Sequence, residues 1–559
     1  MRFSNKFKSS SCSLPSPDGR LVATLLPLGI HIRVVERLDE VANVVPLPDE
    51  LSSTAVVSFQ WSPSSRRLLV ATADVVFVTA VLPAGDEEDS GRGQLFRAVI
   101  RNPALPVVGK PAFVGFGSSD DQVCLCSAFG IKFVVFDLQT SKTVEISHPK
   151  LHSPTSACSR GFSFRPASHH LALLTRTAGK DWISIHSAPS AALVTSWAPD
   201  TIDAQGLLWC PDGRWLAVME SPAYGHKILF YTPDGHFFKA WTGRCSSDGG
   251  SAVGSEGEGR DNTTNVAAAD LAADEALGLG VKIARFSPNA RFMAVGDTTR
   301  RIRIIDMASL VGIWQEQINP SAPSASSELH TFIEAAQAIS PPGRTSPNNP
   351  DGAISAVGAS LLSFDKSSAY LVTRLEDAPS TVWIWDLRTW QLCTVLMFHA
   401  NVSSAVWHPS AARALLVACD GEQHRGVGFV WSHPSNAPAV VDYSRHFSPA
   451  TNDGQPPNVP MGSHRPSWLS LEDQPLLLFY SDGKEFALAA PGANRGSKAS
   501  SAGLWPKAAS SACSTIFDNG SWTVADQRRE ESPLQLVPAE ICTEGDSDLE
   551  DTFHYKREE

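Results

Sequence analysis

The chain has 559 residues, of which 43% are hydrophobic and 19% are charged, so it has enough apolar material for a large core. Its formal net charge of −12 repels phosphate backbones, so nucleic acid is not expected as a partner of the protein body. No uninterrupted apolar run follows the basic N-terminus, and the most apolar early stretch, residues 21–35, is too short to cross a bilayer. We therefore expect a cytosolic protein without membrane insertion.

A short strand-like segment from Arg2 to Phe7 comes first, and after it one sequence motif recurs nine times. Each copy has small or apolar residues around a Trp or Phe, then Ser/Cys-Pro-Asp-Gly or a related turn, then a run of Leu, Val and Ala. A polar turn and a β-branched, aromatic strand complete the unit. In chain order the copies start near Ser16, Phe59, Phe113, Phe162, Leu207, Ala284, Leu362, Ala405 and Trp468.

Equivalent anchor residues mark the units, and many of the spacings between them lie near the roughly 40–45-residue period of a propeller blade. Two longer spacings are explained by insertions. The anchors are Leu14, Trp61, Phe116, Phe164, Trp209, Phe286, Phe364, Trp407 and Leu471.

The repeated motif predicts two strands that are joined by a tight turn. Pro-Asp-Gly fixes φ at Pro, offers a local Asx hydrogen bond and tolerates positive φ at Gly. The apolar run that follows is typical of a strand covered on both faces. In TVWIWDL from Thr381, alternation places Trp383 and Trp385 on one face, and Val382, Ile384 and Asp386 on the other.

These features together predict an all-β protein: a β-propeller of degenerate WD-type repeats, because blades stacked around an axis cover both faces of every sheet. The nine units leave open a single ring of seven, eight or nine blades. The last unit stops near residues 486–488 after two or three strands. We expect the N-terminal strand to complete it, which would remove the open sheet edges.

Residues 1–490 are predicted to form the propeller, with disordered insertions at about 243–268 and 319–352. The second insertion could carry a short helix from about Ser327 to Ala338. Residues 491–559 lose the repeat pattern and are expected to be a largely disordered acidic tail. Ser547 lies among acidic residues there, so the tail is either a solubilising segment or a regulated, phosphorylatable peptide for a partner.

No catalytic or cofactor motif occurs, so the sequence predicts no enzyme, no cofactor and no metal site. Cys124 and Cys126 share one strand face and are expected to be buried thiols rather than a metal or disulfide pair. His169–His170 falls in a turn, where a solvated pair is favoured over a metal site. Carboxylates at 87–89 lie in a polar turn in which nothing would raise a pKa for acid–base work.

Two further groups of residues have open interpretations. Arg300, Arg301 and Arg303 form either a solvated rim or a docking patch for an acidic partner. Many of the 15 tryptophans fall at anchors (Trp61, Trp209, Trp407) or on a third strand (Trp383, Trp385), so core packing is expected to explain most of them. Trp505 and Trp522 fall in the tail and could dock a partner. No motif singles out protein-binding residues, which stay unknown at this stage.

The opening MRFSNKFKSSSCSLPSPDGRLVA resembles the start of the WD repeat-containing protein eight family, the centrosomal and spindle-pole-body WD-repeat proteins. The units LLWCPDGRWLAV, ARFSPNARFMAVG and VWIWDL resemble that family in the same order, and the resemblance covers roughly residues 1–490. Only one Trp-Asp dipeptide, Trp385-Asp386, ends a third strand, and the usual Gly-His is missing from its place. We therefore expect the buried Asp–His–Ser network of regular blades to be mostly absent and the blades to rely on apolar packing.

The resemblance implies a non-catalytic scaffold at the spindle pole body or centrosome. It implies a coiled-coil anchoring partner and help in tethering microtubule minus ends and a minus-end-directed kinesin during mitosis. One alternative is a general cytosolic adaptor in a vesicle coat, a ubiquitin ligase or RNA processing. Another is a propeller enzyme with carboxylates or histidines converging on the central channel.

Overall fold

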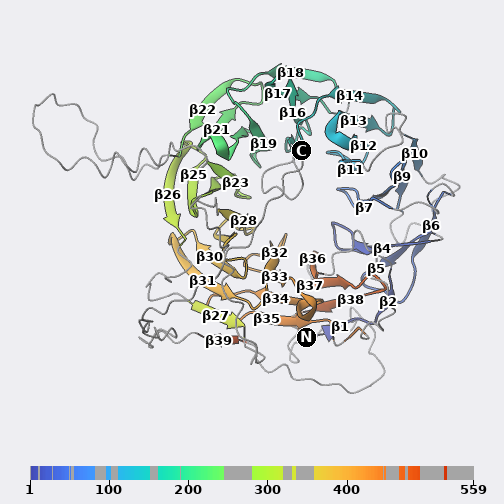
Figure 1. Cartoon of the computed structure of the whole chain (residues 1–559). Coiled ribbons are helices and arrows are strands. Elements are labelled where there is room, and N and C mark those ends of the chain that lie inside the picture. The colour runs from blue at the N-terminus through green and yellow to red at the C-terminus, as the bar shows by residue number, and fades with distance from the viewer. Residues whose placement is uncertain are drawn as a thin grey trace, which may run out of the picture. The chain divides into compact units, whose positions relative to one another are not determined.

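The computed structural model describes residues 2–9, 13–27, 29–48, 51, 56–81, 96–101, 111–151, 161–188, 190–243, 280–318, 330–334, 358–444, 446–447, 465–471, 476–490 and 522–524. These residues all belong to one compact unit within residues 1–524. This unit contains nine sheets arranged as the blades of a ring (Figure 1). The predicted all-β propeller is therefore confirmed, and the open question of seven to nine blades is answered by nine.

In the first eight blades, four antiparallel strands named a, b, c and d run outward from the centre of the ring (Figure 1). Blade 1 contains β3 (Ser13–Pro15), β4 (Leu21–Leu26), β5 (Gly29–Val34) and β6 (Asn43–Pro46). Blade 2 contains β7 (Ser58–Trp61), β8 (Arg67–Ala71), β9 (Val75–Ala80) and β10 (Arg97–Arg101). Blade 3 contains β11 (Phe113–Phe116), β12 (Gln122–Cys126), β13 (Lys132–Asp137) and β14 (Thr143–Ser147). Blade 4 contains β15 (Phe162–Phe164), β16 (Leu171–Thr177), β17 (Lys180–His186) and β18 (Leu193–Trp197).

The remaining blades follow the same order. Blade 5 contains β19 (Ala204–Trp209), β20 (Leu216–Glu220), β21 (Ile228–Tyr231) and β22 (Phe237–Trp241). Blade 6 contains β23 (Val281–Phe286), β24 (Phe292–Asp297), β25 (Arg301–Asp306) and β26 (Val311–Gln317). Blade 7 contains β28 (Ala359–Phe364), β29 (Tyr370–Leu375), β30 (Thr381–Asp386) and β31 (Gln391–Met397). Blade 8 contains β32 (Val402–Trp407), β33 (Leu415–Cys419), β34 (Val427–Trp431) and β35 (Ala439–Asp442). Blade 9 contains β36 (Ser467–Leu469), β37 (Leu477–Ser481) and β38 (Glu485–Ala490).

The N-terminus completes the ninth blade, as the sequence predicted. Strands β1 (Arg2–Phe3) and β2 (Phe7–Lys8) both pair antiparallel with β38, with Arg2 opposite Ala490 and Phe7 opposite Phe486. Because the first strands of the chain form the outer strand of the last blade, the ring is closed by backbone hydrogen bonds between residues almost 490 positions apart.

The core lies between neighbouring sheets. Every residue of β20 is buried, as expected for a strand covered on both sides. In β30 the predicted alternation is confirmed: Trp383 and Trp385 pack with Ile302 and other residues of blade 6, whereas Val382 packs with residues of blade 8. One strand thus contributes to two cores, and each blade depends on both of its neighbours.

Two of the three anchor tryptophans, Trp61 and Trp407, also hydrogen-bond across blade junctions. Nε1 of Trp61 in blade 2 donates to the carbonyl of Leu14 in blade 1 at 3.1 Å. Nε1 of Trp407 in blade 8 donates to the carbonyl of Ser363 in blade 7 at 3.0 Å. At these two positions the aromatic anchor has a polar role besides packing, since it ties adjacent a strands together, whereas Nε1 of Trp209 has no hydrogen-bond partner among the described residues.

The turn between strands a and b requires a left-handed backbone. Gly19 of the first Pro-Asp-Gly turn has φ of +73°. A Cβ at this position would overlap the backbone oxygen of Ser470 in blade 9. Glycine is therefore needed here both for its backbone conformation and for the close approach of two blades.

One segment differs from its prediction. In the second insertion, where a short helix over 327–338 was an option, residues His330–Glu334 form strand β27, so the helix is wrong there. Strand β27 pairs parallel with β31 and antiparallel with β39 (Trp522–Val524), a strand from the predicted tail. Blade 7 thereby gains two strands. The first insertion, from residue 244 on, lies outside the described residues.

Candidate functional site

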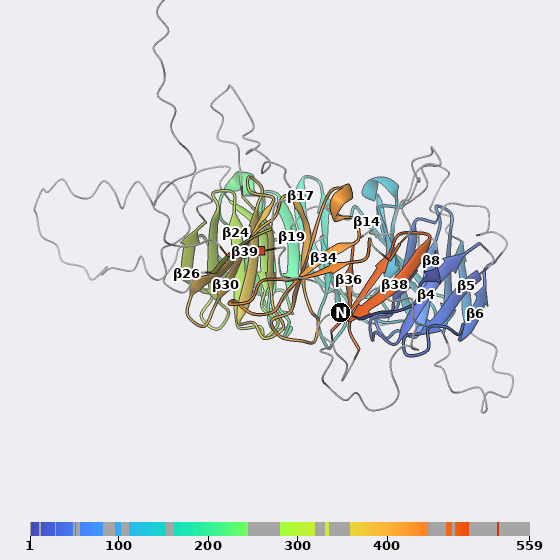
Figure 2. The same ribbon diagram turned by 90° about the horizontal axis from the view of Figure 1, so that it is seen from below.

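One face of the ring is formed by the turns between strands b and c and by the connections from strand d to the next strand a; we call it the b–c face. Its turns include three 3-10 helices, η2 (Ala128–Gly130), η3 (Pro222–Tyr224) and η5 (Glu422–His424). All three project on the same side of the ring (Figure 2). This face carries a series of ion pairs and several exposed apolar side chains.

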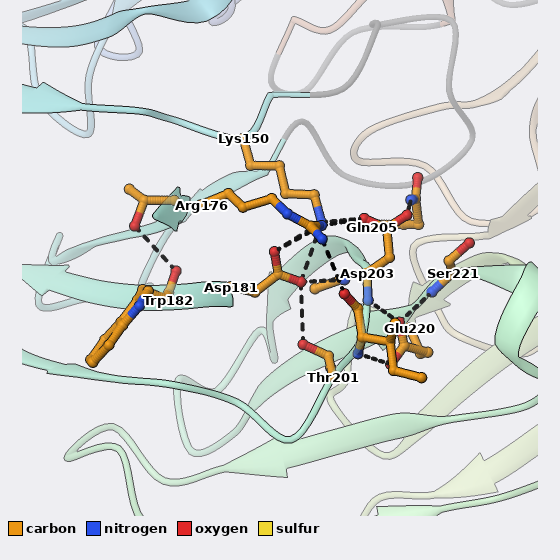
Figure 3. A network of polar contacts seen from close by, with 12 residues as sticks. Lys150, Arg176, Asp181, Trp182, Thr201, Asp203, Gln205, Glu220 and Ser221 are labelled. Carbon is orange, nitrogen blue, oxygen red and sulfur yellow. Dashed lines mark hydrogen bonds and ion pairs between the residues drawn. The ribbon is translucent and has the colours of Figure 1, made fainter. Parts of the chain in front are cut away.

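The carboxylate of Asp181, near the start of β17, is fully buried at the centre of a polar network (Figure 3). Nζ of Lys150, from the connection between blades 3 and 4, lies 3.1 Å from Oδ1 of Asp181 and 2.6 Å from Oδ1 of Asp203. Nη1 of Arg176 lies 3.4 Å and 2.8 Å from the same two oxygens. The backbone N–H of Ala204 donates to Oδ2 of Asp181 at 2.7 Å. Two carboxylates thus balance two cations across three chain segments.

The second half of this network fixes the connection between blades 4 and 5. The carboxylate of Glu220 accepts the backbone N–H groups of Ile202 and Asp203, each at 2.8 Å (Figure 3). Partial burial by itself would raise the pKa of Asp203, but the hydrogen bond and charge of Lys150 and the charge of Arg176 outweigh it and lower that pKa. The carboxylate is held in its charged form, which suits a structural ion pair and not a proton donor near neutral pH.

A buried network links blades 5 and 6. Nη1 of Arg303 donates to Oδ2 of Asp297 at 2.9 Å, and Nε of Arg303 donates to Oε1 of Gln315 at 2.9 Å. Nε2 of His226, from blade 5, lies 2.9 Å from Nη1 of Arg303. The side chains of Arg303, Asp297 and His226 are each 1% exposed. Burial would raise the pKa of Asp297, but the hydrogen bond from His226 and the charge of Arg303 lower it overall.

Both interpretations of the arginine cluster are therefore wrong for Arg303, because a buried cation is neither a solvated rim nor a docking patch. Arg300 instead pairs with Asp377 of blade 7. The expectation that the blades rely on apolar packing alone also needs correction. Polar networks do join blades, although their residues differ from the Asp–His–Ser set of regular WD blades.

The ion pairs continue around the b–c face to the last blades. Lys282 of blade 6 pairs with Glu376 of blade 7. Oε1 of Glu334 lies 3.0 Å from Nε2 of His424 in blade 8. Nη2 of Arg465, just before blade 9, lies 2.9 Å from Oδ1 of Asp420. An ion pair or a hydrogen bond to a charged side chain therefore lies at each junction from blade 4 to blade 9, and these contacts align the connections of this face.

Large apolar side chains are exposed in the b–c face of blades 3 to 5. Phe129 is 84% exposed, Ile131 and Ile202 are each 58% exposed, and Tyr224 is 44% exposed. Their turns are held by hydrogen bonds: the N–H of Ile131 donates to Oγ of Ser127, and the backbone of Ile202 is held by Glu220. Apolar groups presented by fixed backbone lose little entropy on binding, which is typical of protein docking sites.

Phe129 is also conformationally strained. Its φ is +66° and its ψ is 6°, a left-handed conformation that is costly for a bulky residue. Because the ring is almost fully exposed, it buries little apolar surface, and its packing does not offset the conformational strain. Phe129 is therefore a candidate residue of the functional site. Sequence reasoning missed it, although Ser127-Ala128-Phe129-Gly130 does place an aromatic residue next to the glycine of a hairpin turn.

The remaining residues that the sequence singled out are either in structural positions or outside the described residues. Cys124 and Cys126 are buried free thiols in one core cluster, as predicted, and burial raises their pKa to about 12 and about 11. His169 is exposed in the turn between β15 and β16, and its φ is +59°. Residues 87–89, Trp505 and Ser547 lie outside the described residues, and of Trp522 only the backbone is described.

The alternative of a propeller enzyme predicts carboxylates or histidines at the central channel. The nine a strands, which lie nearest the centre of the ring, contain no Asp, Glu or His. Among the described residues no group of three or more His, Cys, Asp or Glu side chains could hold a metal ion. The helices in that same part of the chain are too short or too polar to cross a membrane.

No family model matches the chain. The chain is 23% identical over 458 residues to WD repeat-containing protein WRAP73 of Mus musculus, a match that covers 75% of this chain and 85% of that protein. It is 20% identical over 341 residues to an uncharacterized WD repeat-containing protein of Schizosaccharomyces pombe, covering 58% of this chain and 62% of that protein.

Two solved structures are distantly similar. A crystal structure of a eukaryotic initiation factor has a TM-score of 0.44 and 12% identity, covering 77% of this chain and 87% of that chain. The β-propeller domain of Cps50 (Swd1) from Myceliophteria thermophila has a TM-score of 0.37 and 11% identity, covering 68% of this chain and 97% of that chain. At these TM-scores the likenesses add nothing to the fold, which the nine sheets define.

Proposed function

Since this chain is a WD-repeat β-propeller protein, we propose that it is a non-catalytic scaffold at the spindle pole body or centrosome. Its residues predicted a WD-repeat family, and both relatives are WD repeat-containing proteins. The place in the cell is supported by the resemblance of the N-terminal segment and of units five to seven to the centrosomal WD-repeat proteins. In this role the protein helps to tether microtubule minus ends and a minus-end-directed kinesin during mitosis.

The observation that carries the scaffold role is the set of exposed apolar residues on the b–c face: Phe129, Ile131, Ile202 and Tyr224. Of these residues, Ile202 contacts the charged network of Lys150, Arg176 and Asp203, because its backbone carbonyl accepts a hydrogen bond from Nη2 of Arg176. A coiled-coil partner offers a matching surface, because its helices combine apolar positions with flanking charges. We therefore propose that the b–c face of blades 3 to 5 binds the coiled-coil anchoring protein.

The test is to image the tagged full chain in dividing cells of its own source. We expect the wild-type protein to concentrate at the poles in mitosis, and we expect Phe129→Asp with Ile131→Asp to become diffuse while remaining folded. Ile313→Asp is the matched control, because Ile313 is 38% exposed on a d strand away from this face. A wild-type protein that is diffuse or nuclear throughout mitosis would contradict the location. Purification with vesicle-coat, ubiquitin-ligase or RNA-processing subunits would favour the adaptor role instead.

A further inference from the structure

The outer edges of the blades differ in how they are protected. A d strand exposes unpaired N–H and C=O groups, and natural sheets blunt such edges with charged residues or proline. Six of the d strands follow this rule, with Pro46 in β6, Arg97 and Arg101 in β10, Glu145 in β14, Lys239 in β22, Glu316 in β26 and Asp442 in β35. Two d strands, β18 (Leu193–Trp197, LVTSW) and β31 (QLCTVLM), carry neither a charge nor a proline, and of these two it is β31 that has a further strand paired to it among the described residues. Its edge is one that another strand can extend.

In this structure the chain itself extends that edge. Strand β27 pairs parallel with β31, from His330 opposite Thr394 to Ile333 opposite Met397. Strand β39 then pairs antiparallel with β27, with Thr523 opposite Ile333. Among the described residues, blade 7 alone has six strands.

Strand β27 is anchored firmly. Phe332 is 1% exposed and packs with Val382, Leu396 and other residues of the core between blades 7 and 8. The carboxylate of Glu334 accepts the backbone N–H of His399 at 3.0 Å and lies 3.0 Å from Nε2 of His424. These contacts join β27 to two blades, so it forms a fixed outer edge of the propeller.

Strand β39 is held differently. It has three residues, and in the described part of the chain its only strand partner is β27. Main-chain pairing tolerates many side chains, which is why exposed sheet edges accept peptides from other proteins. Residues 522–524, Trp-Thr-Val, are strongly β-prone and uncharged, and they show the kind of segment that this edge accepts.

We propose that the outer edge of β27 is a strand-acceptor site, that Trp522–Val524 occupies it in cis, and that an extended, uncharged, β-prone segment of a protein partner competes for it by strand addition. The site is separate from the b–c face of blades 3 to 5. It goes beyond the proposed function, and its test does not depend on where the protein lies in the cell.

The probe is a fluorescein-labelled peptide of residues 518–528, whose binding to the full chain is followed by fluorescence anisotropy. In a variant chain, Trp522→Pro and Thr523→Pro together remove two consecutive N–H groups, one of which must face β27 because N–H directions alternate along a strand. Ala508→Pro with Ala509→Pro, elsewhere in the tail, is the matched control.

We expect the peptide to bind the Trp522→Pro, Thr523→Pro chain at least about ten-fold more tightly than the wild-type or control chain, because the cis competitor has been removed. A peptide carrying the same two prolines should bind none of the chains. Equal binding to all chains, no binding to any chain, or undiminished binding of the proline peptide would each overturn the proposal.

Discussion

Nη1 of Arg303 lies 2.9 Å from Oδ2 of Asp297, and both side chains are 1% exposed between blades 5 and 6. The cation and the carboxylate are thus shielded from water and depend on each other. Removal of one partner from a buried pair leaves an uncompensated charge, which typically costs about 3–5 kcal/mol.

We therefore expect Arg303→Met, which keeps most of the side-chain volume, to destabilise the propeller by about 3 kcal/mol or more. The measurement is urea unfolding followed by tryptophan fluorescence. Arg214→Met is the control, because the Arg214 side chain is 76% exposed and its ion pair with Asp212 should contribute less than about 1 kcal/mol. Equal effects of the two variants would show that burial of Arg303 is unimportant.

Two buried tryptophans should respond differently to the same substitution. Nε1 of Trp407 donates to Ser363, whereas Nε1 of Trp431 has no hydrogen-bond partner among the described residues. The substitution Trp407→Phe removes an existing hydrogen bond, whereas Trp431→Phe removes an N–H group that has no hydrogen-bond acceptor in that part of the chain. We expect Trp407→Phe to cost about 1 kcal/mol more in the free energy of unfolding, although Trp431 is the more deeply buried. A larger loss from Trp431→Phe in urea titrations would contradict this.

Gly19 and Gly179 separate backbone strain from close packing. Both have positive φ, +73° and +78°. An Ala at either position would therefore pay the free-energy cost of a left-handed backbone conformation, about 1–2 kcal/mol. A Cβ at Gly19 would also overlap Ser470, whereas a Cβ at Gly179 would meet no atom within 4 Å. We expect Gly19→Ala to lower the melting temperature more than Gly179→Ala, since it also pushes blades 1 and 9 apart. Matching melting curves for the two variants would argue against a tight closure of the ring.

The network around Asp203 should make stability sensitive to acid. The pKa of Asp203 is lowered from its ordinary value of 3.8, so its contribution is complete above that value and is lost as the pH falls through the lower folded-state value. We expect Asp203→Asn to be less stable than the wild type at neutral pH and to lose less on acidification below about pH 4. Asp200→Asn is the control, because the Asp200 side chain is 92% exposed. Unfolding midpoints in urea across this pH range would reveal parallel curves if the lowered pKa were wrong.

Phe129 should show a conflict between stability and binding. Asn tolerates the left-handed conformation that Phe129 adopts, so Phe129→Asn is expected to raise the free energy of unfolding by about 1 kcal/mol. The same change should weaken binding to the coiled-coil partner, because it removes an exposed aromatic ring. Phe237→Asn, on strand β22, should bring no such gain, since Phe237 is 57% exposed but lies on a regular strand. A Phe129→Asn protein that is destabilised would remove the argument from strain.

Much of the fold was predictable because it depends on local patterns. The nine units, the anchors near the ends of the a strands and the two faces of β30 all follow from turn chemistry and from alternation of side chains within a few residues. The closure by Arg2–Phe7 could also be predicted, since an incomplete last unit leaves one strand position empty.

Only the tertiary structure decided the burial of Arg303, the strand at β27 and the exposure of Phe129. The sequence around Arg303 is the same whether that residue is solvated or buried, and its burial depends on His226, 77 positions earlier in the preceding blade. In the same way, β27 becomes a strand because β31 offers an edge to it, and Phe129 is exposed because its turn points out of the b–c face. These outcomes depend on contacts between blades, which local propensity does not contain.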